Sequence, residues 1–293
     1  MAVRTLGVIG AGQMGAGIAQ VAAQAGLEVI LNDVSQELVD RGIRGIGRNL
    51  DRMIERGRFQ PDERDRVLRR VRGSANLEDL ASADFVVEAV VESEEVKINL
   101  LQKLDKICGP EVILASNTSS ISITRMGART ARADRVIGMH FMNPVPAMKL
   151  VEIIRGLATS EETFMTTRAL AEELGKSTMT AQDFPGFIVN RVLLPMINEA
   201  IYTLYEGVGG VLDIDKAMKL GTNQPMGPLE LADLIGLDTC LAIMEVMQRV
   251  LGDDKYRPCP LLKKYVDAGY LGRKSGRGFY KYDEKGNPIP PAL

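Results

Sequence analysis

The sequence is poor in the residues that mark several classes of protein. Its 293 residues include no tryptophan, one histidine, three cysteines and only 5% aromatic residues. Cys108, Cys240 and Cys259 are odd in number and far apart, a pattern typical neither of a disulfide framework nor of a zinc or redox site. We therefore expect no bound metal and a reducing, cytoplasmic environment.

An excess of charge of one sign is also missing, because 36 basic residues stand against 38 acidic ones. Without a net positive field the chain is not expected to bind nucleic acid. No apolar run approaches the roughly 20 residues that span a bilayer, so no membrane partner is expected. The first strand is expected near Thr5, which leaves no room for a signal peptide.

Short runs rich in Val and Ile alternate with helical patterns through the first half of the chain. This alternation predicts right-handed βαβ units and a parallel sheet covered on both faces, that is, a Rossmann-like doubly wound α/β fold. About fifty residues separate the second expected strand from the third, so residues 35–82 are expected to form a helical hairpin that protrudes from the sheet. The expected strands are 5–9, 28–32, 85–89, 112–116, 136–140 and 150–154.

The pattern changes at Phe184 and Pro185, beyond which the sequence predicts only helices. We therefore expect two domains, an α/β domain over residues 1–184 and an all-α domain over residues 185–293. The expected helix ends in the second domain are Asp213 and Asp238 as N-caps and Gly221, Gly236 and Gly252 as C-caps.

A glycine-rich turn follows the first expected strand. Gly10-Ala11-Gly12-Gln13-Met14-Gly15 fits the dinucleotide pattern, and Asp33 ends the next strand. Asp33 would accept hydrogen bonds from the ribose hydroxyls and repel a 2′-phosphate, while Val34 and Ser35 offer no cation. The sequence therefore predicts NAD as cofactor in preference to NADP. The alternative is a glycine-rich turn in a doubly wound fold that binds nothing.

The single histidine, His140, ends an expected strand, at the edge of the sheet where ligands bind in such folds. Pro144 and Pro146 predict a turn, after which Glu152 lies in a neighbouring strand and can return beside His140. A carboxylate on one ring nitrogen would fix the tautomer and make the other nitrogen a better base. The alternative is a histidine with a purely structural role.

Small polar side chains follow the strand at 112–116. Asn117 and Ser119 are placed to orient a substrate hydroxyl or the nicotinamide ribose, although Ser120 and Ser122 also fit as helix N-caps.

Eleven arginines and five acidic residues lie between Arg41 and Arg72, and Arg44, Arg48, Arg52 and Arg56 recur every four residues. Such a stripe on one side of a helix suits a polyanionic ligand, because guanidinium groups bind phosphate bidentately. The alternative is a solvated helix face.

Taken together, several motifs resemble those of the 3-hydroxyacyl-CoA dehydrogenase family over essentially the whole chain, and most closely its short-chain bacterial 3-hydroxybutyryl-CoA dehydrogenases. They are VIGAGQMG at 8–15, ASNTSS at 115–120, HFMNP at 140–144 with LVE at 150–152, PGFIVNR at 185–191 and GRKSGRGFY at 272–280.

The resemblance implies a role for each matching residue. It makes His140 the catalytic base and Glu152 its orienting partner. The other implied contacts are Ser119 and Asn190 with the reacting end of the substrate; Asp33, Glu92, Lys97, Asn117, Ser119, Asn143 and Lys274 with the cofactor; and Arg52 and Arg56 with coenzyme A.

The resemblance also implies the reaction and the assembly. The expected activity is reversible NAD-dependent oxidation of a (S)-3-hydroxyacyl-CoA, such as 3-hydroxybutyryl-CoA, to the 3-oxoacyl-CoA, acetoacetyl-CoA. The expected partners are the acyl-CoA and a second copy of the chain, bound through the C-terminal helices. Two alternatives remain: a 3-hydroxyacid or sugar-acid dehydrogenase on the same scaffold, and a non-catalytic NAD-binding structural protein.

Overall fold

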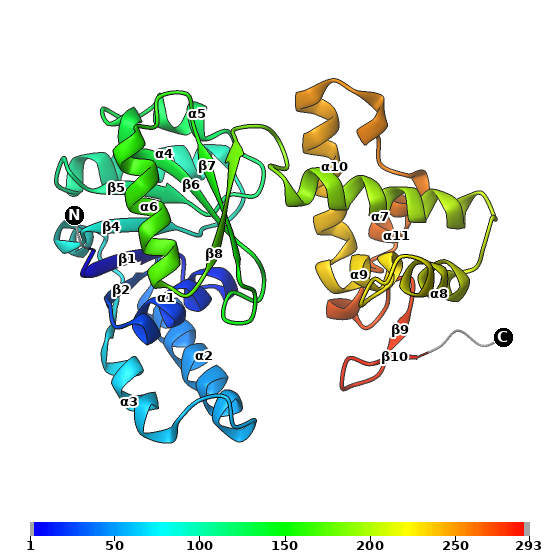
Figure 1. Ribbon diagram of the computed structural model, residues 1–293, viewed down its shortest axis with the longest axis horizontal. Helices are drawn as coiled ribbons and strands as arrows, with labels where there is room; N and C mark the ends of the chain where they lie inside the picture. The colour runs from blue at the N-terminus through cyan, green and yellow to red at the C-terminus, as the bar shows by residue number, and fades with distance from the viewer. Residues whose placement is uncertain (1–2, 290–293) are drawn as a thin grey trace. The chain divides into compact units, whose positions relative to one another are not determined.

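The computed structural model describes residues 3–289, and the chain divides into two compact units (Figure 1). The first unit ends at Phe184 and the second begins at Pro185. Each unit has its own apolar core of buried side chains. No helix within residues 3–289 is long and apolar enough to cross a membrane.

The first unit is built on an eight-stranded sheet with the strand order β3-β2-β1-β4-β5-β6-β7-β8. All neighbouring strands are parallel except β6 and β7, which pair antiparallel. From β1 the chain adds strands first on one side, β2 and β3, and then on the other side, beginning with β4. The position between β1 and β4 is therefore the switch point at which doubly wound sheets bind ligands. The strands are β1 (Thr5–Ile9), β2 (Glu28–Asn32), β3 (Val71–Ser74), β4 (Phe85–Glu88), β5 (Ile113–Ser116), β6 (Val136–Phe141), β7 (Leu150–Arg155) and β8 (Ser177–Gln182).

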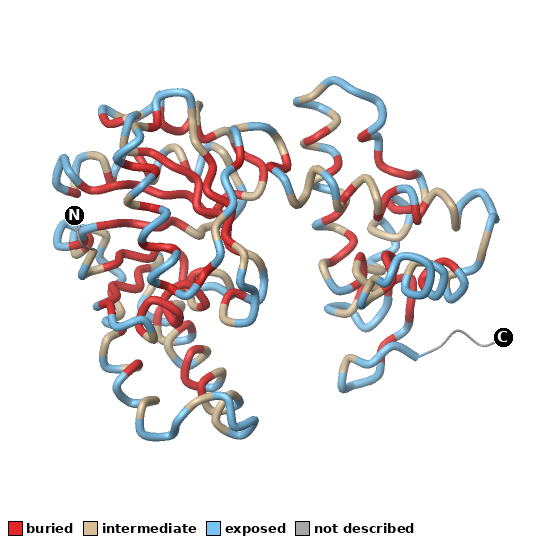
Figure 2. The backbone as a smooth tube through the Cα atoms, viewed as in Figure 1, coloured by how far each residue is buried: buried red, intermediate tan, exposed pale blue. Residues whose placement is uncertain are grey.

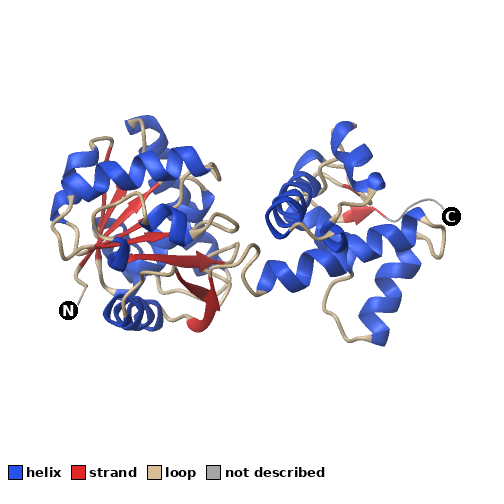
Figure 3. Ribbon diagram, turned by 90° about the horizontal axis from the view of Figure 1, so that it is seen from above, coloured by secondary structure: helices blue, strands red, loops and turns tan. Residues whose placement is uncertain are grey.

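Helices cover both faces of this sheet, as Figure 3 shows. The Rossmann-like fold expected from the sequence is therefore confirmed. The central strands form the red, buried layer in Figure 2, and their apolar side chains belong to the core. The helices are α1 (Gln13–Ala25), α2 (Gln36–Glu55), α3 (Pro61–Arg69), α4 (Glu94–Ile107), α5 (Ile123–Gly127) and α6 (Glu161–Glu173).

The six expected strands are present, but the two strands at the sheet edges, β3 and β8, were not expected. Both lack the continuous apolar run of a central strand, because an edge strand is only partly covered; in β8 only Ala181 is buried. The protruding hairpin is formed by α2 and α3, which pack together. It is shorter than expected, because the chain returns to the sheet as β3 directly after α3.

The second unit consists of helices with one addition, a two-stranded antiparallel hairpin of β9 (Lys281–Tyr282) and β10 (Pro288–Ile289). The all-α expectation is correct for its core and wrong for this hairpin. The helices are α7 (Val189–Tyr205), α8 (Val211–Gly221), α9 (Pro228–Ile235), α10 (Leu237–Leu251) and α11 (Pro260–Asp267).

Three of the expected helix ends in this unit are wrong. Asp213 and Asp238 lie in the first turns of α8 and α10, whose N-caps are Gly210 and Gly236, and Gly221 is the last residue of α8. An acidic side chain stabilises a first turn as well as a cap, so its presence does not fix the starting residue. Gly236 and Gly252 are confirmed as C-caps, with φ angles of 104° and 65°.

All three cysteines are free and buried. Burial raises the pKa of Cys240 to about 12, so this thiol stays protonated at neutral pH. Burial also raises the pKa of Cys108 and of Cys259, which disfavours the thiolate form that a nucleophile or a metal ligand requires.

Candidate active site

The glycine turn connects β1 to α1 at the switch point of the sheet. Gly10 has φ 96°, and a Cβ atom there would lie 2.5 Å from the carbonyl oxygen of Ala89, after β4. A Cβ on Gly15 would lie 1.7 Å from the carbonyl oxygen of Gly10, so both positions require glycine.

Gly12 differs from the other two glycines, because nothing lies within 4 Å of the position of its Cβ atom. It is also the N-cap of α1, and no side chain caps that helix. The turn thus leaves open space in front of a helix N-terminus whose first N–H groups can bind a phosphate. These features fit the pyrophosphate of a dinucleotide.

Asp33, directly after β2, faces this turn. One of its carboxylate oxygens accepts a hydrogen bond from the backbone N–H of Ala11 at 2.7 Å, and the other accepts from Val34 N–H at 2.7 Å. Val34 itself is 90% exposed and uncharged. A fixed negative charge beside the turn accepts hydrogen bonds from ribose hydroxyls and disfavours a 2′-phosphate there.

His140 and Glu152 are direct cross-strand partners in the antiparallel pair β6 and β7. The Nδ1 atom of His140 lies 2.7 Å from Oε2 of Glu152, whose side chain is fully buried. An ionised carboxylate can only accept, so Nδ1 carries the proton and Nε2 is left as the basic nitrogen. The expected pairing of the two residues is what the structure shows.

Ser119 lies on the other side of the imidazole, with its Oγ atom 3.1 Å from Nε2 of His140. The loop after β5 therefore brings a hydroxyl to the basic nitrogen. Asn117 has a different contact: its Oδ1 atom accepts a hydrogen bond at 2.8 Å from the backbone N–H of Phe141, which fixes the end of β6. Ser122 caps α5, whereas Ser120 donates to Glu92 instead.

The loop after β6, which starts just beyond His140, is held from two sides. Gln13 of the glycine turn donates to Oδ1 of Asn143 at 2.9 Å, and the Asn143–Pro144 peptide bond is cis. The ammonium of Lys176 donates to the carbonyls of Val145 and Met148 at 2.6 and 2.9 Å. Burial lowers the pKa of Lys176, and nothing in the sequence marked this residue.

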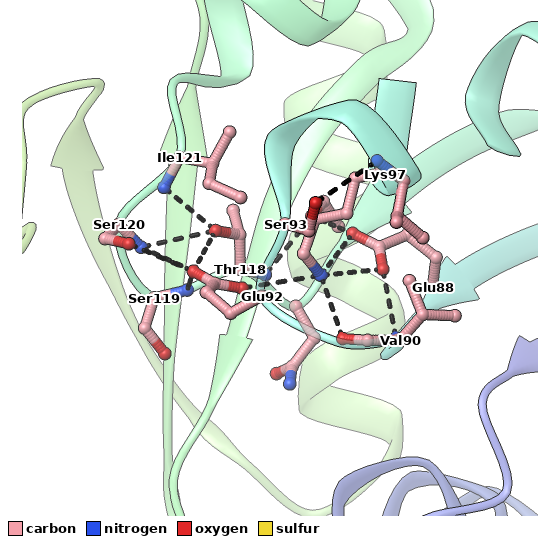
Figure 4. Close-up of polar contacts among 12 residues, drawn as sticks. Glu88, Val90, Glu92, Ser93, Lys97, Thr118, Ser119, Ser120 and Ile121 are labelled. Carbon is pink, nitrogen blue, oxygen red and sulfur yellow. Dashed lines mark hydrogen bonds and ion pairs between the residues drawn. The ribbon is translucent and has the colours of Figure 1, made fainter. Parts of the chain in front are cut away.

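Glu92 and Lys97, both expected near the dinucleotide, belong to one network of polar contacts (Figure 4). Oε1 of Glu92 accepts from the backbone N–H of Ser119 at 2.9 Å and from the Thr118 hydroxyl at 2.6 Å. The side chain of Lys97 is only 1% exposed, and its ammonium lies 2.8 Å from a carboxylate oxygen of Glu88. Glu88 was missed by the sequence analysis, because it ends an otherwise apolar strand with no motif around it.

The arginine stripe lies on the exposed side of α2 and at its C-terminal end, as expected. Arg44, Arg48, Arg52 and Arg56 are all exposed. Within residues 3–289, none of these four side chains forms an ion pair with a carboxylate. Their charges are therefore available to a polyanion.

Asn190 and Lys274 belong to the second unit. Asn190 is half-buried in the first turn of α7. The ammonium of Lys274 lies 2.7 Å from a carboxylate oxygen of Asp238. Their contacts with substrate and cofactor stay predictions.

Both units match models of a single protein family. Residues 5–184 match the NAD-binding domain of 3-hydroxyacyl-CoA dehydrogenase, and residues 186–282 match the C-terminal domain of the same enzymes. The chain belongs to the 3-hydroxyacyl-CoA dehydrogenase family. The resemblance drawn from the motifs is thereby confirmed, and so is NAD as the cofactor.

Relatives in this dehydrogenase family cover nearly the whole chain. A protein of Bacillus subtilis named as a probable 3-hydroxybutyryl-CoA dehydrogenase is 58% identical, over 97% of this chain and 99% of its own. The 3-hydroxybutyryl-CoA dehydrogenase of Bradyrhizobium diazoefficiens is 56% identical over 98% of both chains. The crystal structure of (S)-3-hydroxybutyryl-CoA dehydrogenase from Ralstonia eutropha is similar with a TM-score of 0.93 and 50% identity, covering 97% of this chain and 100% of the other.

Replacing the carboxylate beside the glycine turn tests how this dehydrogenase selects its cofactor. Because like charges near a protein surface repel by up to roughly 4 kcal/mol, we expect Asp33→Ala to narrow the preference for NADH over NADPH by at least about tenfold. The ratio of kcat/KM for the two cofactors measures this. A wild type that already prefers NADPH, or an unchanged ratio in the variant, contradicts the assignment of Asp33.

Proposed function

We propose that this protein catalyses the reversible NAD-dependent oxidation of (S)-3-hydroxybutyryl-CoA to acetoacetyl-CoA. The observation that carries the proposal is the chain of contacts from Glu152 through His140 to Ser119, which presents a basic nitrogen and a hydroxyl at the carboxyl ends of the strands. The names of the similar proteins support the choice of substrate.

In the proposed reaction, Nε2 of His140 removes the proton from the 3-hydroxyl group of the substrate, and Glu152 stabilises the imidazolium that forms. Bound NAD supplies the acceptor for the hydride that leaves C3. Ser119 holds the substrate oxygen beside Nε2, and Asn190 is its proposed second polar contact. In the reverse direction His140 returns the proton to the alcohol.

We further propose a division of labour between the two parts of the chain. Residues 1–184 bind NAD, and residues 185–293 serve substrate binding and dimerisation. The proposed cofactor contacts in the first part are Asp33, Glu92, Lys97, Asn117, Ser119 and Asn143, and Lys274 of the second part is a further one. The guanidinium groups of Arg52 and Arg56, which form no ion pair within residues 3–289, are the proposed contacts of the coenzyme A phosphates. The free, buried cysteines support a cytoplasmic location, which fractionation of cells would test.

Removing the imidazole tests the proton transfer. We expect His140→Ala to lose roughly 10²- to 10⁴-fold in kcat, because a positioned general base contributes about that much. Glu152→Gln is expected to lower kcat more than it weakens cofactor binding. The measurements are steady-state kinetics and NADH fluorescence titration. Near-normal turnover by His140→Ala, or a Glu152→Gln defect confined to cofactor affinity, contradicts these roles.

The requirement for coenzyme A separates the proposed function from its alternatives. We expect NADH to be oxidised with acetoacetyl-CoA and not with free acetoacetate. A hydroxyacid dehydrogenase would turn over the free acid, and a non-catalytic NAD-binding protein would bind NADH and turn over neither.

Within the same experiment, Arg52→Ala and Arg56→Ala should raise KM for acetoacetyl-CoA by roughly tenfold, since a hydrogen bond to a charged group contributes about 1.5–3 kcal/mol. Arg69→Ala, an exposed arginine of α3 outside the stripe, is the matched control. Equal effects of all three variants would point to general electrostatics and against a specific phosphate site.

A homodimer through the C-terminal helices is the proposed assembly. An apolar hollow of about 460 Å³ in the second unit, lined by Met196, Ile214, Ala217 and Met218 among others, supports it. We expect Ala217→Glu, which places a charge in this hollow, to shift the protein from dimer to monomer in sedimentation velocity. Lys219→Glu on the same helix is the control. A monomeric wild type, or an unaffected Ala217→Glu, contradicts the proposal.

A further inference from the structure

The buried charges beside the active site have no role in the proton transfer itself. Glu88 and Lys97 form an ion pair in which the side chains are 0% and 1% exposed. Burying such a pair is expensive, and apolar residues of similar size are often as stable or more so. The other three residues of β4 are apolar and buried, so Glu88 is the one charged residue of this strand.

Glu88 connects the two loops that follow the neighbouring strands β4 and β5. It is the register partner of Ser116 and accepts a hydrogen bond from the Ser116 hydroxyl. That hydroxyl in turn accepts from the backbone N–H of Thr118 at 3.2 Å. The other carboxylate oxygen of Glu88 accepts from the backbone N–H of Val90 at 3.2 Å.

Lys97 continues these contacts toward Glu92. Its ammonium lies 3.3 Å from the carbonyl oxygen of Val90 and 3.5 Å from Oε2 of Glu92. The other oxygen of Glu92 holds the loop after β5 through the backbone N–H groups of Ser119 and Ser120, at 2.9 and 3.1 Å. Figure 4 shows Glu92 between this loop on one side and Lys97 with Glu88 on the other.

We infer that Glu88 is a positioning residue for the reaction, an inference that rests on the proposed function. Glu88 acts on the Ser119 loop twice, through Ser116 and through Lys97 and Glu92, and so fixes the 3.1 Å contact between Ser119 and His140. Fully satisfied buried networks of this kind make a local structure rigid. The loop that orients the substrate oxygen is thus held by a charge that never touches the substrate.

Removal of the charge at Glu88 tests this role. We expect Glu88→Gln to lower kcat for acetoacetyl-CoA reduction by roughly 10- to 100-fold, because small misplacements of reacting groups cost that much. KM for both substrates should stay close to the wild-type values. Ser116→Ala, which cuts one of the two connections without changing a charge, should lower kcat less. A wild-type kcat in both variants overturns the inference.

A double variant distinguishes two roles of Glu88: positioning of the Ser119 loop, and neutralisation of the buried charge of Lys97. Glu88→Leu with Lys97→Met removes both buried charges, so we expect the thermal unfolding temperature to stay near or above that of wild type. We expect kcat to remain low even at saturating NADH, a condition that removes any effect of Lys97 on cofactor affinity. If the pair only balanced its own charges, the double variant would recover kcat, and the inference would be wrong. This variant also decides the matter if Glu88→Gln does not fold.

Asp105→Asn is the matched control. Asp105 lies on the same helix as Lys97 and forms an ion pair with the buried Arg132 at 2.7 Å. No contact of this pair with a residue of the active site is among those described. The Asp105→Asn variant should lower the unfolding temperature and leave kcat unchanged. A loss of kcat like that of Glu88→Gln would mean that stability alone controls turnover. Wild-type protein that binds NADH but does not reduce acetoacetyl-CoA would refute the proposed function itself, whatever the variants do.

Discussion

The structure of the site depends on one cross-strand contact, the hydrogen bond between Glu152 and His140. It exists because β7 runs antiparallel to β6, the only such pair in a sheet that is otherwise parallel between neighbours. With parallel strands, two residues twelve positions apart could not stand opposite one another, since a crossover needs a dozen or more residues. The loop held by Asn143 and Lys176 is what makes the reversal. The contact on which the proposed proton transfer depends thus exists because one pair of strands in the sheet is antiparallel.

Three of the buried charges of the first unit lie near that contact. Glu88, Lys97 and Glu152 are almost completely buried, and each is compensated by partners within hydrogen-bond distance. The glycine turn, where Gly12 leaves space for a phosphate, follows the carboxyl end of β1. Strand ends in a doubly wound sheet collect such groups, because the carboxyl ends of parallel strands meet there and the helices begin nearby. Cofactor binding and proton transfer are therefore built on neighbouring strands of one rigid layer.

The charges at the surface of α2 differ from the buried ones in their surroundings and in their proposed role. The arginines of the stripe on α2 are exposed and unpaired among the described residues. Beside the site, in contrast, Lys97 forms an ion pair with Glu88 and Lys176 donates hydrogen bonds to backbone carbonyls. An exposed guanidinium costs little to keep and binds a mobile anion, while a buried ammonium has to be fixed in place. Basic side chains are thus used in two ways: exposed ones to bind a charged ligand, and buried ones to hold a loop of the active site in place.

The sequence alone determined the glycine turn, the cofactor, the alternation of strands and helices, and the pairing of His140 with Glu152. These features depend on residues close together in the chain, where spacing fixes geometry. The tertiary structure decided the rest. The edge strands β3 and β8 form because a neighbouring strand offers hydrogen bonds, and the starts of α8 and α10 depend on backbone geometry. The roles of Glu88 and Lys176 arise because packing brings together residues that lie far apart in the chain, and no local pattern records which charge will be buried against which partner.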